Sequence, residues 1–229
     1  MLAWIIYAAL GLVAGVLAGL LGVGGGIVIV PMLSIAFDLQ GLPSQYIQHM
    51  ALGTSLGTIM FTSISSFRAH HKHGAVNWSV VRRITLGIIV GTLAGSWVAA
   101  QLSTRFLKGF FAVFLFYVAT QMILNIKPKG GRQLPGRVGM SGVGGVIGVV
   151  SSLVGIGGGT LSVPFMVWCN MTMHNAVGTS AAIGFPIAVA GAAGYLINGL
   201  KVASELPPMS LGFLYLPALI GIAETSILT

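Results

Sequence analysis

The chain has very few charged side chains, and this scarcity decides its class. Its 229 residues include 11 Lys and Arg but only three acids, so charged residues make up 6% of the sequence. A soluble globular domain carries about a quarter charged residues, which cover its water-facing surface. The composition therefore excludes a soluble enzyme, a disordered chain and a coiled coil. Because 55% of the residues are hydrophobic, the class that remains is an integral membrane protein.

Groups that carry catalysis are also scarce. The chain has one cysteine, Cys169, which allows no internal disulfide. Its only acids are Asp38, Glu205 and Glu224, and no Walker sequence or Ser/His/Asp pattern occurs. We therefore predict that the protein is not an enzyme and uses no cofactor. The net charge of +8 does not indicate nucleic-acid binding, because the basic residues lie between apolar runs, where positive-inside anchoring accounts for them.

Long apolar runs are the main feature that is present. Most of them are long enough, at about 1.5 Å per helical residue, to cross a hydrocarbon core of about 30 Å. The runs show no strict alternation, which favours helices over a β-barrel. We expect an all-α polytopic protein that crosses the inner or plasma membrane of the cell several times. The apolar segments are Leu2–Leu21, Met50–Phe67, Ile84–Leu102, Phe106–Ile126, Val138–Val154, Ala176–Leu200 and Met209–Leu228.

The chain also repeats itself. The cluster Gly22–Gly26, followed by Pro31, recurs as Gly155–Gly159 followed by Pro164. The segment 49–55 (HMALGTS) recurs as 174–180 (HNAVGTS). These ordered matches predict a first repeat over 1–126, a basic cytoplasmic linker over 127–137 and a second repeat over 138–229. The second repeat has one long apolar segment fewer, so we expect it to be incomplete at its C-terminus.

Each glycine cluster precedes a short apolar piece, Ile27–Phe37 or Thr160–Cys169. As helices these pieces span about 15 Å, half of a bilayer, which is typical of broken or re-entrant membrane helices. The connections 68–83 and 127–137 each carry four basic residues, which assigns both to the cytoplasm. The count of basic residues fits parallel or inverted repeats. We expect inverted repeats, because the loop with Lys201 and Glu205 is far less basic than its counterpart 68–83.

The glycine clusters are the first candidate binding site. Consecutive glycines weaken a membrane helix and leave backbone groups that hydrocarbon cannot satisfy. Two helix N-termini that face each other near the midplane would offer unpaired N–H groups to an anion. Close packing of helices is the alternative interpretation, and the matched prolines favour the site. The glycines predicted to bind are Gly24, Gly25, Gly26, Gly157, Gly158 and Gly159.

Side chains next to these clusters extend the candidate site. The hydroxyls of Thr54, Ser55, Thr179 and Ser180 are placed at helix starts, where they either cap the helices or donate to an oxyanion. Two histidines and one acid are candidates for gating: His49, His174 and Glu224. The matched histidines are interpreted as polar helix edges or as proton-sensitive gates. Glu224 is the only acid within an apolar run, which makes it a functional candidate.

These motifs resemble those of the TauE/SafE family of membrane permeases, over a range from about Gly11 to Gly199. The resemblance implies two halves of opposite orientation with a substrate path between them, and transport of sulfite, sulfonate and related organosulfur anions. Family members have eight or so helices, and the short C-terminus departs from that. The family's recurrent positions fall on Gly22, Gly24–Gly26, Pro31, Gly53–Ser55, Gly155, Gly157–Gly159, Pro164 and Gly178–Ser180.

The sequence therefore predicts a secondary transporter that exports a small sulfur oxyanion, such as sulfite or an organosulfonate, by alternating access around a midplane site. The expected partners are this anion and the lipid bilayer, with a proton or sodium ion as an open choice of coupling ion, and no nucleic acid. A passive anion channel and an intramembrane metal enzyme are the alternatives. The enzyme would use His70, His71 and His73, but the few carboxylates favour a plain basic loop, and we predict no metal site.

Overall fold

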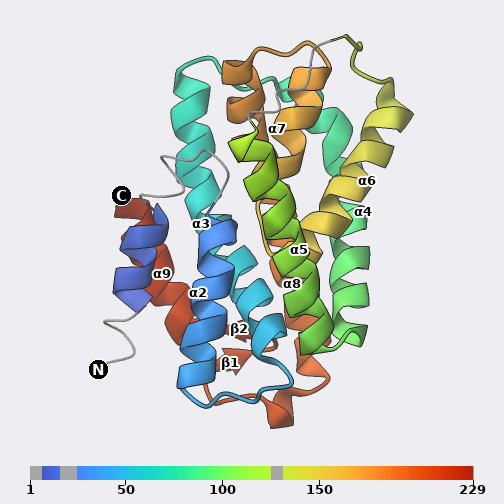
Figure 1. The fold of residues 1–229 in the computed structure, drawn as a ribbon. Coiled ribbons are helices and arrows are strands. Elements are labelled where there is room, and N and C mark those ends of the chain that lie inside the picture. The colour runs from blue at the N-terminus through green and yellow to red at the C-terminus, as the bar shows by residue number, and fades with distance from the viewer. Residues whose placement is uncertain (1–6, 16–24, 125–130, 229) are drawn as a thin grey trace.

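The computed structural model describes residues 7–15, 25–124 and 131–228, which are almost entirely helical. Residues 7–15 are helical, and two strands of two residues each form a hairpin before the last helix. The elements, labelled in Figure 1 where there is room, are α2 (Gly26–Leu39), α3 (Ile47–Lys72), α4 (Trp78–Gln101), α5 (Thr104–Ile123), α6 (Arg137–Val154), α7 (Gly159–Trp168), α8 (Met173–Leu200), η1 (Ala203–Glu205), β1 (Ser210–Leu211), β2 (Leu214–Tyr215) and α9 (Leu216–Leu228).

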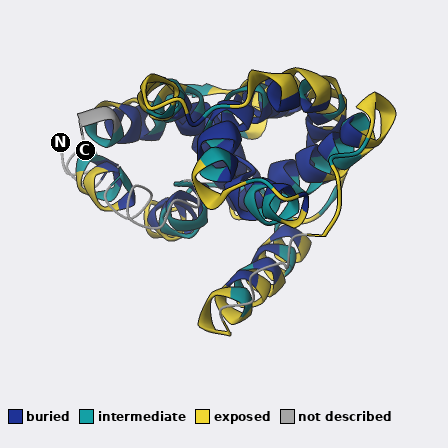
Figure 2. Ribbon diagram, turned by 90° about the horizontal axis from the view of Figure 1, so that it is seen from above, coloured by how far each residue is buried: buried dark blue, intermediate teal, exposed yellow. Residues whose placement is uncertain are grey.

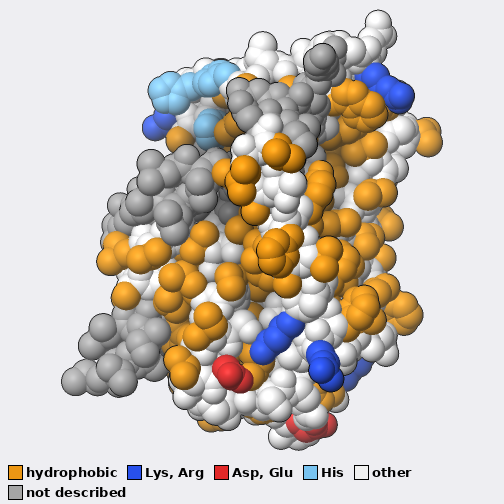
Figure 3. All heavy atoms as spheres, viewed as in Figure 1, with side chains coloured by type: hydrophobic (Ala, Val, Ile, Leu, Met, Phe, Trp, Pro, Cys, Tyr) orange, Lys and Arg blue, Asp and Glu red, His pale blue; other side chains and the backbone are white. Residues whose placement is uncertain are grey.

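Five of the described helices are long and apolar enough to cross a membrane, namely α3, α4, α5, α6 and α8. Hydrophobic side chains cover the middle of the face shown in Figure 3, and most charged and histidine side chains lie toward its two ends. The prediction of an all-α polytopic membrane protein is thereby confirmed. The pieces behind the glycine clusters are short, as predicted: α2 has 14 residues and α7 has 10.

The last apolar segment differs from the prediction of one helix over Met209–Leu228. Its first residues form the β1–β2 hairpin, and the helix begins only at Leu216. The physical reason is local backbone geometry, because Met209 and Gly212 both have positive φ, 67° and 58°. The Phe213 N–H then donates to the carbonyl oxygen of Tyr195 on α8 (3.3 Å). A helix cannot pass through two such residues.

The two helices that carry the Gly-Thr-Ser segments, α3 and α8, pack against each other in opposite directions (Figure 1). The segment that follows α8 returns to α3 about two turns after its start, where the N–H of Tyr215 donates to Thr54 Oγ1 (3.0 Å). The segment that follows α3 returns to α8 about two turns after its start, where the N–H of Asn77 donates to Thr179 Oγ1 (2.9 Å). The short helices α2 and α7 also point toward opposite ends of the bundle. These directions support inverted halves.

Small residues bring α4 and α6 unusually close. A Cβ at Gly91 would lie 2.1 Å from the carbonyl oxygen of Gly145, and Gly87 and Gly95 on the same face of α4 meet α6 in the same way. Backbones that touch in this manner pack tightly without needing a hydrophobic driving force in lipid. By contrast, α5 stands apart when the bundle is seen from above (Figure 2), and its Phe116 and Tyr117 side chains are exposed.

Candidate functional site

The described parts of the two glycine clusters touch. Gly22–Gly24 lie outside the described residues, so the first cluster is represented by Gly25 and Gly26. Gly26 is the first residue of α2, and a Cβ built on it would lie 2.3 Å from the carbonyl oxygen of Gly155. Gly155 and Gly158 have φ values of 72° and 79°, a left-handed conformation that suits glycine. The chain that leaves α6 is therefore turned so that Gly155 and Ile156 lie against Gly26.

The second glycine cluster leaves backbone donors unpaired. Residues 155–160 are all buried. The amides before the break donate to the carbonyl oxygen of Ser151, and those after it donate to the carbonyl oxygen of Gly158, at 2.8–3.1 Å. These bonds leave a buried group of N–H donors at the positive end of a helix, a common setting for anion binding. The amides with no acceptor among the described residues are those of Gly157, Gly158, Gly159 and Thr160.

Two hydroxyls at the same place also have no partner within the described part of the chain. They are Ser151 Oγ and Thr160 Oγ1. Ser151 is fully buried, and Thr160 is 8% exposed. Ser151 Oγ lies 3.7 Å from the position that a Cβ on Gly158 would occupy. Sequence reasoning missed both side chains. A signal was present, since Ser151 and Ser152 interrupt an apolar run directly before the glycines.

The prediction that the Gly-Thr-Ser hydroxyls lie at helix starts is wrong. Thr54 and Ser55 lie about two turns inside α3, and Thr179 and Ser180 lie equally deep in α8. The N-cap of α8 is Thr172, whose hydroxyl accepts from the N–H of Asn175. Capping of these helices by the four hydroxyls is thus excluded.

The two serines reach the second glycine cluster. Ser55 Oγ donates to the carbonyl oxygen of Gly155 (2.8 Å), across the contact between the two halves. Ser180 Oγ accepts from Ser162 Oγ (2.8 Å), and the amide of Ser162 donates to the carbonyl oxygen of Gly158. Ser55 therefore bonds directly to the second glycine cluster, and Ser180 is connected to it through Ser162.

The hydroxyls of the two threonines accept hydrogen bonds from backbone N–H groups of the opposite half. Thr54 Oγ1 holds the backbone of Tyr215 just before α9, and Thr179 Oγ1 holds the backbone of Asn77 just before α4. We call these two contacts the reciprocal threonine bonds. The glycine before each threonine makes room for them: a Cβ at Gly53 would lie 2.8 Å from the Phe213 carbonyl oxygen, and Gly178 meets the backbone of residue 75 in the same way. Among the described residues, neither threonine bonds to the glycine clusters.

The gating candidates lie in three different environments. His49 is buried, and its Nε2 lies 3.1 Å from the carbonyl oxygen of Ala99 and 3.0 Å from that of Leu102, at the end of α4. His174, its sequence counterpart, is exposed at the start of α8, and Glu224 is exposed on α9. The matched histidines are therefore not structurally equivalent.

The histidine loop does not assemble a metal site in the part of the chain that the structure describes. No group of three His, Cys, Asp or Glu side chains there is placed to hold a metal ion. The ring of His71 is engaged by its neighbour Trp78, whose indole N–H donates to His71 Nδ1 (3.2 Å).

An exposed polar cluster joins the halves at the end of the bundle opposite to this loop. The Glu205 carboxylate accepts from Gln45 Nε2 (2.8 Å) and from the Tyr46 hydroxyl (3.0 Å). Desolvation and the hydrogen bond and charge of Glu205 raise the pKa of the Tyr46 phenol above its ordinary value. The phenol therefore stays protonated and keeps donating to the carboxylate at neutral pH.

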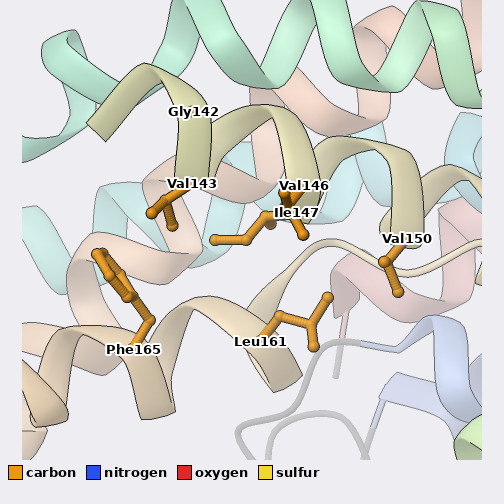
Figure 4. A pocket seen from close by; sticks show the side chains of 7 residues that line it. All are labelled: Gly142, Val143, Val146, Ile147, Val150, Leu161 and Phe165. Atoms are coloured by element: carbon orange, nitrogen blue, oxygen red, sulfur yellow. The ribbon is translucent and has the colours of Figure 1, made fainter. Parts of the chain in front are cut away.

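A separate apolar groove lies between α6 and α7 (Figure 4). Its volume is about 410 Å³, and it is lined by Gly142, Val143, Val146, Ile147, Val150, Leu161 and Phe165. The groove is distinct from the glycine break but adjacent to it, because Ile147 Cγ2 also lies 3.6 Å from the position of a Cβ on Gly158. The lining offers almost no polar groups, so the groove has no means of holding an anion.

Comparison with known proteins gives one family for nearly the whole chain. Residues 7–228 match the family described as "Sulfite exporter TauE/SafE". No solved structure matches the chain.

The relatives carry a common description. A "Probable membrane transporter protein" of Haemophilus influenzae is 36% identical over 220 residues, which cover 96% of this chain and 83% of the relative. A protein of the same description from Methanocaldococcus jannaschii is 30% identical over 90% of this chain and 76% of its own length. One from Bacillus subtilis is 28% identical over 86% of this chain and 80% of its own length.

Proposed function

The chain belongs to the TauE/SafE family of multi-pass membrane transporters, and on this premise we propose that it exports a small sulfur oxyanion, sulfite or an organosulfonate. The observation that carries the proposal is the group of buried amides at the start of α7 that have no acceptor in the part of the chain that the structure describes. Such donors at a helix N-terminus favour a negative ligand without any cationic side chain. The protein is a transporter rather than an enzyme.

We propose that the substrate site lies where the two glycine clusters meet. The supporting contacts are those of Gly26 with Gly155 and of Ser55 with the carbonyl oxygen of Gly155. The predicted glycines thus supply the backbone of the site, and Ser55 and Ser180 support it from α3 and α8. The role of Thr54 and Thr179 in this proposal is to hold the two halves together around the site.

We propose alternating access by movement of one repeat, 1–126, against the other, 138–229. The helices α3 and α8 run in opposite directions, and so do α2 and α7. This supports the proposal, because two inverted halves that move against each other can expose one site to either face of the membrane in turn. The Glu205 cluster and the histidine loop lie at the two ends at which the path would open. The basic connection 68–83 assigns the histidine end to the cytoplasm.

The test is flux of radiolabelled sulfite into vesicles that contain the purified full-length protein. We expect saturable uptake that accelerates when unlabelled sulfite is present on the opposite face, a behaviour of carriers and not of channels. Gly158→Leu should abolish uptake, because Gly158 has φ 79° and its Cβ would lie 2.4 Å from Ile187 Cδ1. Gly109→Ala on α5, where a Cβ meets nothing within 4 Å, is the matched control and should transport normally.

Three results would each overturn a part of the proposal. Wild-type vesicles that take up neither sulfite nor a short alkanesulfonate would refute the substrate class. Undiminished uptake by the Gly158→Leu variant would refute the site. Uptake without acceleration by substrate on the opposite face would replace the carrier with a channel. The same vesicles, with a proton or a sodium gradient imposed, identify the coupling ion by the gradient that drives accumulation.

A further inference from the structure

We infer that oxygens of the anion are held by a donor pocket of the second half, made of Ser151 and residues 157–160. This inference rests on the proposed function and names the side chains that set its affinity. Residues 157–160 supply the unpaired amides, and Ser151 Oγ and Thr160 Oγ1 supply two hydroxyls. All of these donors belong to the end of α6, the glycine break and the first turn of α7.

The unpaired hydroxyls are the first reason. More than nine in ten buried polar groups in folded proteins have a hydrogen-bond partner, because leaving one unmade is costly. Ser152 shows the usual solution, since its hydroxyl is also fully buried and donates to the carbonyl oxygen of Val149 (2.8 Å) on its own helix. Ser151 is its neighbour on the same helix and forms no such bond. An external acceptor accounts for Ser151, Thr160 and the four amides together.

The repeat supplies the second reason. Aligning Gly155 with Gly22 places Ser151 opposite Ala18 and Thr160 opposite Ile27. The first half therefore has no hydroxyl at either of the corresponding positions. The first amides of α2 also have no acceptor among the described residues, but the two hydroxyl donors at the break belong to the second half. We therefore expect the side chains of the second half to set the affinity for the anion.

The side chains that border the break indicate which anion it should prefer. Ile59 Cγ2 lies 3.2 Å from the position of a Cβ on Gly157, and Ile187 Cδ1 lies 2.4 Å from that of a Cβ on Gly158. Neither isoleucine side chain offers a hydrogen-bond donor. A group with three oxygens on one side, such as sulfite or an alkanesulfonate, can direct them at the donor pocket and its bare or alkyl side at the isoleucines. Sulfate would bury its fourth oxygen without a partner, which is unfavourable. The pocket should therefore prefer sulfite and methanesulfonate to sulfate.

The experiment measures binding of radiolabelled sulfite to the full-length protein in lipid nanodiscs, with flux measured in parallel. Hydrogen bonds to a charged ligand are strong enough that Ser151→Ala and Thr160→Val should each weaken sulfite binding by about 10-fold or more. Thr160→Ser keeps the hydroxyl and should bind as wild type does. Ser152→Ala removes a neighbouring hydroxyl that already has a partner and should leave the affinity unchanged.

A second control removes an unpartnered hydroxyl elsewhere. Thr92 Oγ1 is fully buried without a partner among the described residues, but it faces Gly148 on α6 rather than the break. Thr92→Val should not weaken sulfite binding. Tryptophan fluorescence checks that each variant is folded, and if Ser151→Ala does not fold, the pair Thr160→Val and Thr160→Ser decides by itself.

The outcomes separate the two proposals. If wild type transports sulfite but Ser151→Ala and Thr160→Val bind it as tightly as Ser152→Ala does, the donor pocket is refuted and the proposed function stands. If sulfate competes with sulfite as well as methanesulfonate does, the pocket has no three-oxygen preference and that part of the inference fails. If wild type neither binds nor transports sulfite or methanesulfonate, both proposals fail.

Discussion

Adding one methyl group at Gly26 tests whether the two glycine clusters touch. Gly26 is the first residue of α2, and its backbone is helical, so alanine meets no conformational barrier there. Its Cβ, however, would lie 2.3 Å from the carbonyl oxygen of Gly155 and 2.8 Å from the Cα of Ile156. Carbon atoms pack best at about 3.5–4.0 Å, and backbone atoms cannot escape by changing a rotamer. Overpacking of this kind costs about 1–3 kcal/mol.

The control for this prediction is an alanine that meets nothing. Gly109→Ala on α5 has open space around its Cβ and should gain up to about 1 kcal/mol from helix propensity. We therefore expect Gly26→Ala to unfold at a lower temperature than wild type and Gly109→Ala at an equal or higher one. Tryptophan fluorescence of the detergent-purified protein, at one fixed heating rate, measures both. A Gly26→Ala variant as stable as Gly109→Ala would refute the contact between the clusters.

Three further predictions follow from contacts outside the glycine break. Thr54→Val and Thr179→Val each leave one backbone N–H without its acceptor, so each should destabilise the protein by about 1–3 kcal/mol. If either variant is as stable as wild type in the same thermal assay, the reciprocal threonine bonds are contradicted. Cys169 is 6% exposed and should react with a maleimide much more slowly in the native protein than after denaturation in SDS, and equal rates would show that it is not buried. Desolvation and, after it, the neighbouring Glu205 raise the pKa of Tyr46, so Glu205→Gln should lower that pKa part of the way toward the ordinary value of about 10. The phenolate absorbance that is lost in Tyr46→Phe measures this pKa, and an unchanged midpoint would exclude the contact.

The short helices could be predicted from sequence because their cause is local. A glycine cluster interrupts the helix, and the apolar residues behind it are too few to cross a bilayer. The predicted pieces Ile27–Phe37 and Thr160–Cys169 match α2 and α7 within two residues at each end. The direction of α3 and α8 could also be anticipated, since the loops after them differ so strongly in basic charge.

The boundaries that were missed depend on distant contacts. The helix α3 begins before the apolar run because Gln48 and His49 are buried, and the ring of His49 is satisfied by carbonyl oxygens at the end of α4, about 50 residues away. Hydropathy counts both residues as polar, so the predicted segment begins too late, at Met50. The β1–β2 hairpin was missed for the opposite reason: its residues are apolar enough for a helix, and only their φ angles and their packing on Tyr195 exclude one.

The glycines and the serines Ser55 and Ser180 of the candidate site could be predicted, but the hydroxyls of Ser151 and Thr160 were missed. Matching the two repeats directs attention to residues that occur twice, which are the glycines and the Gly-Thr-Ser segments. Ser151 and Thr160 have no counterpart in the first repeat, so the comparison passes over them. They stand out only when every buried hydroxyl is checked for a partner, and that requires coordinates.

The reciprocal threonine bonds have a consequence for how this protein is made. Thr54 enters the membrane early in synthesis, but its backbone partner lies 161 residues further along the chain. Until the ribosome has delivered residues 213–215, Thr54 lacks its backbone partner and Gly53 lacks its contact with the Phe213 carbonyl oxygen. A chain that stops before these residues therefore leaves this contact between the two repeats unmade.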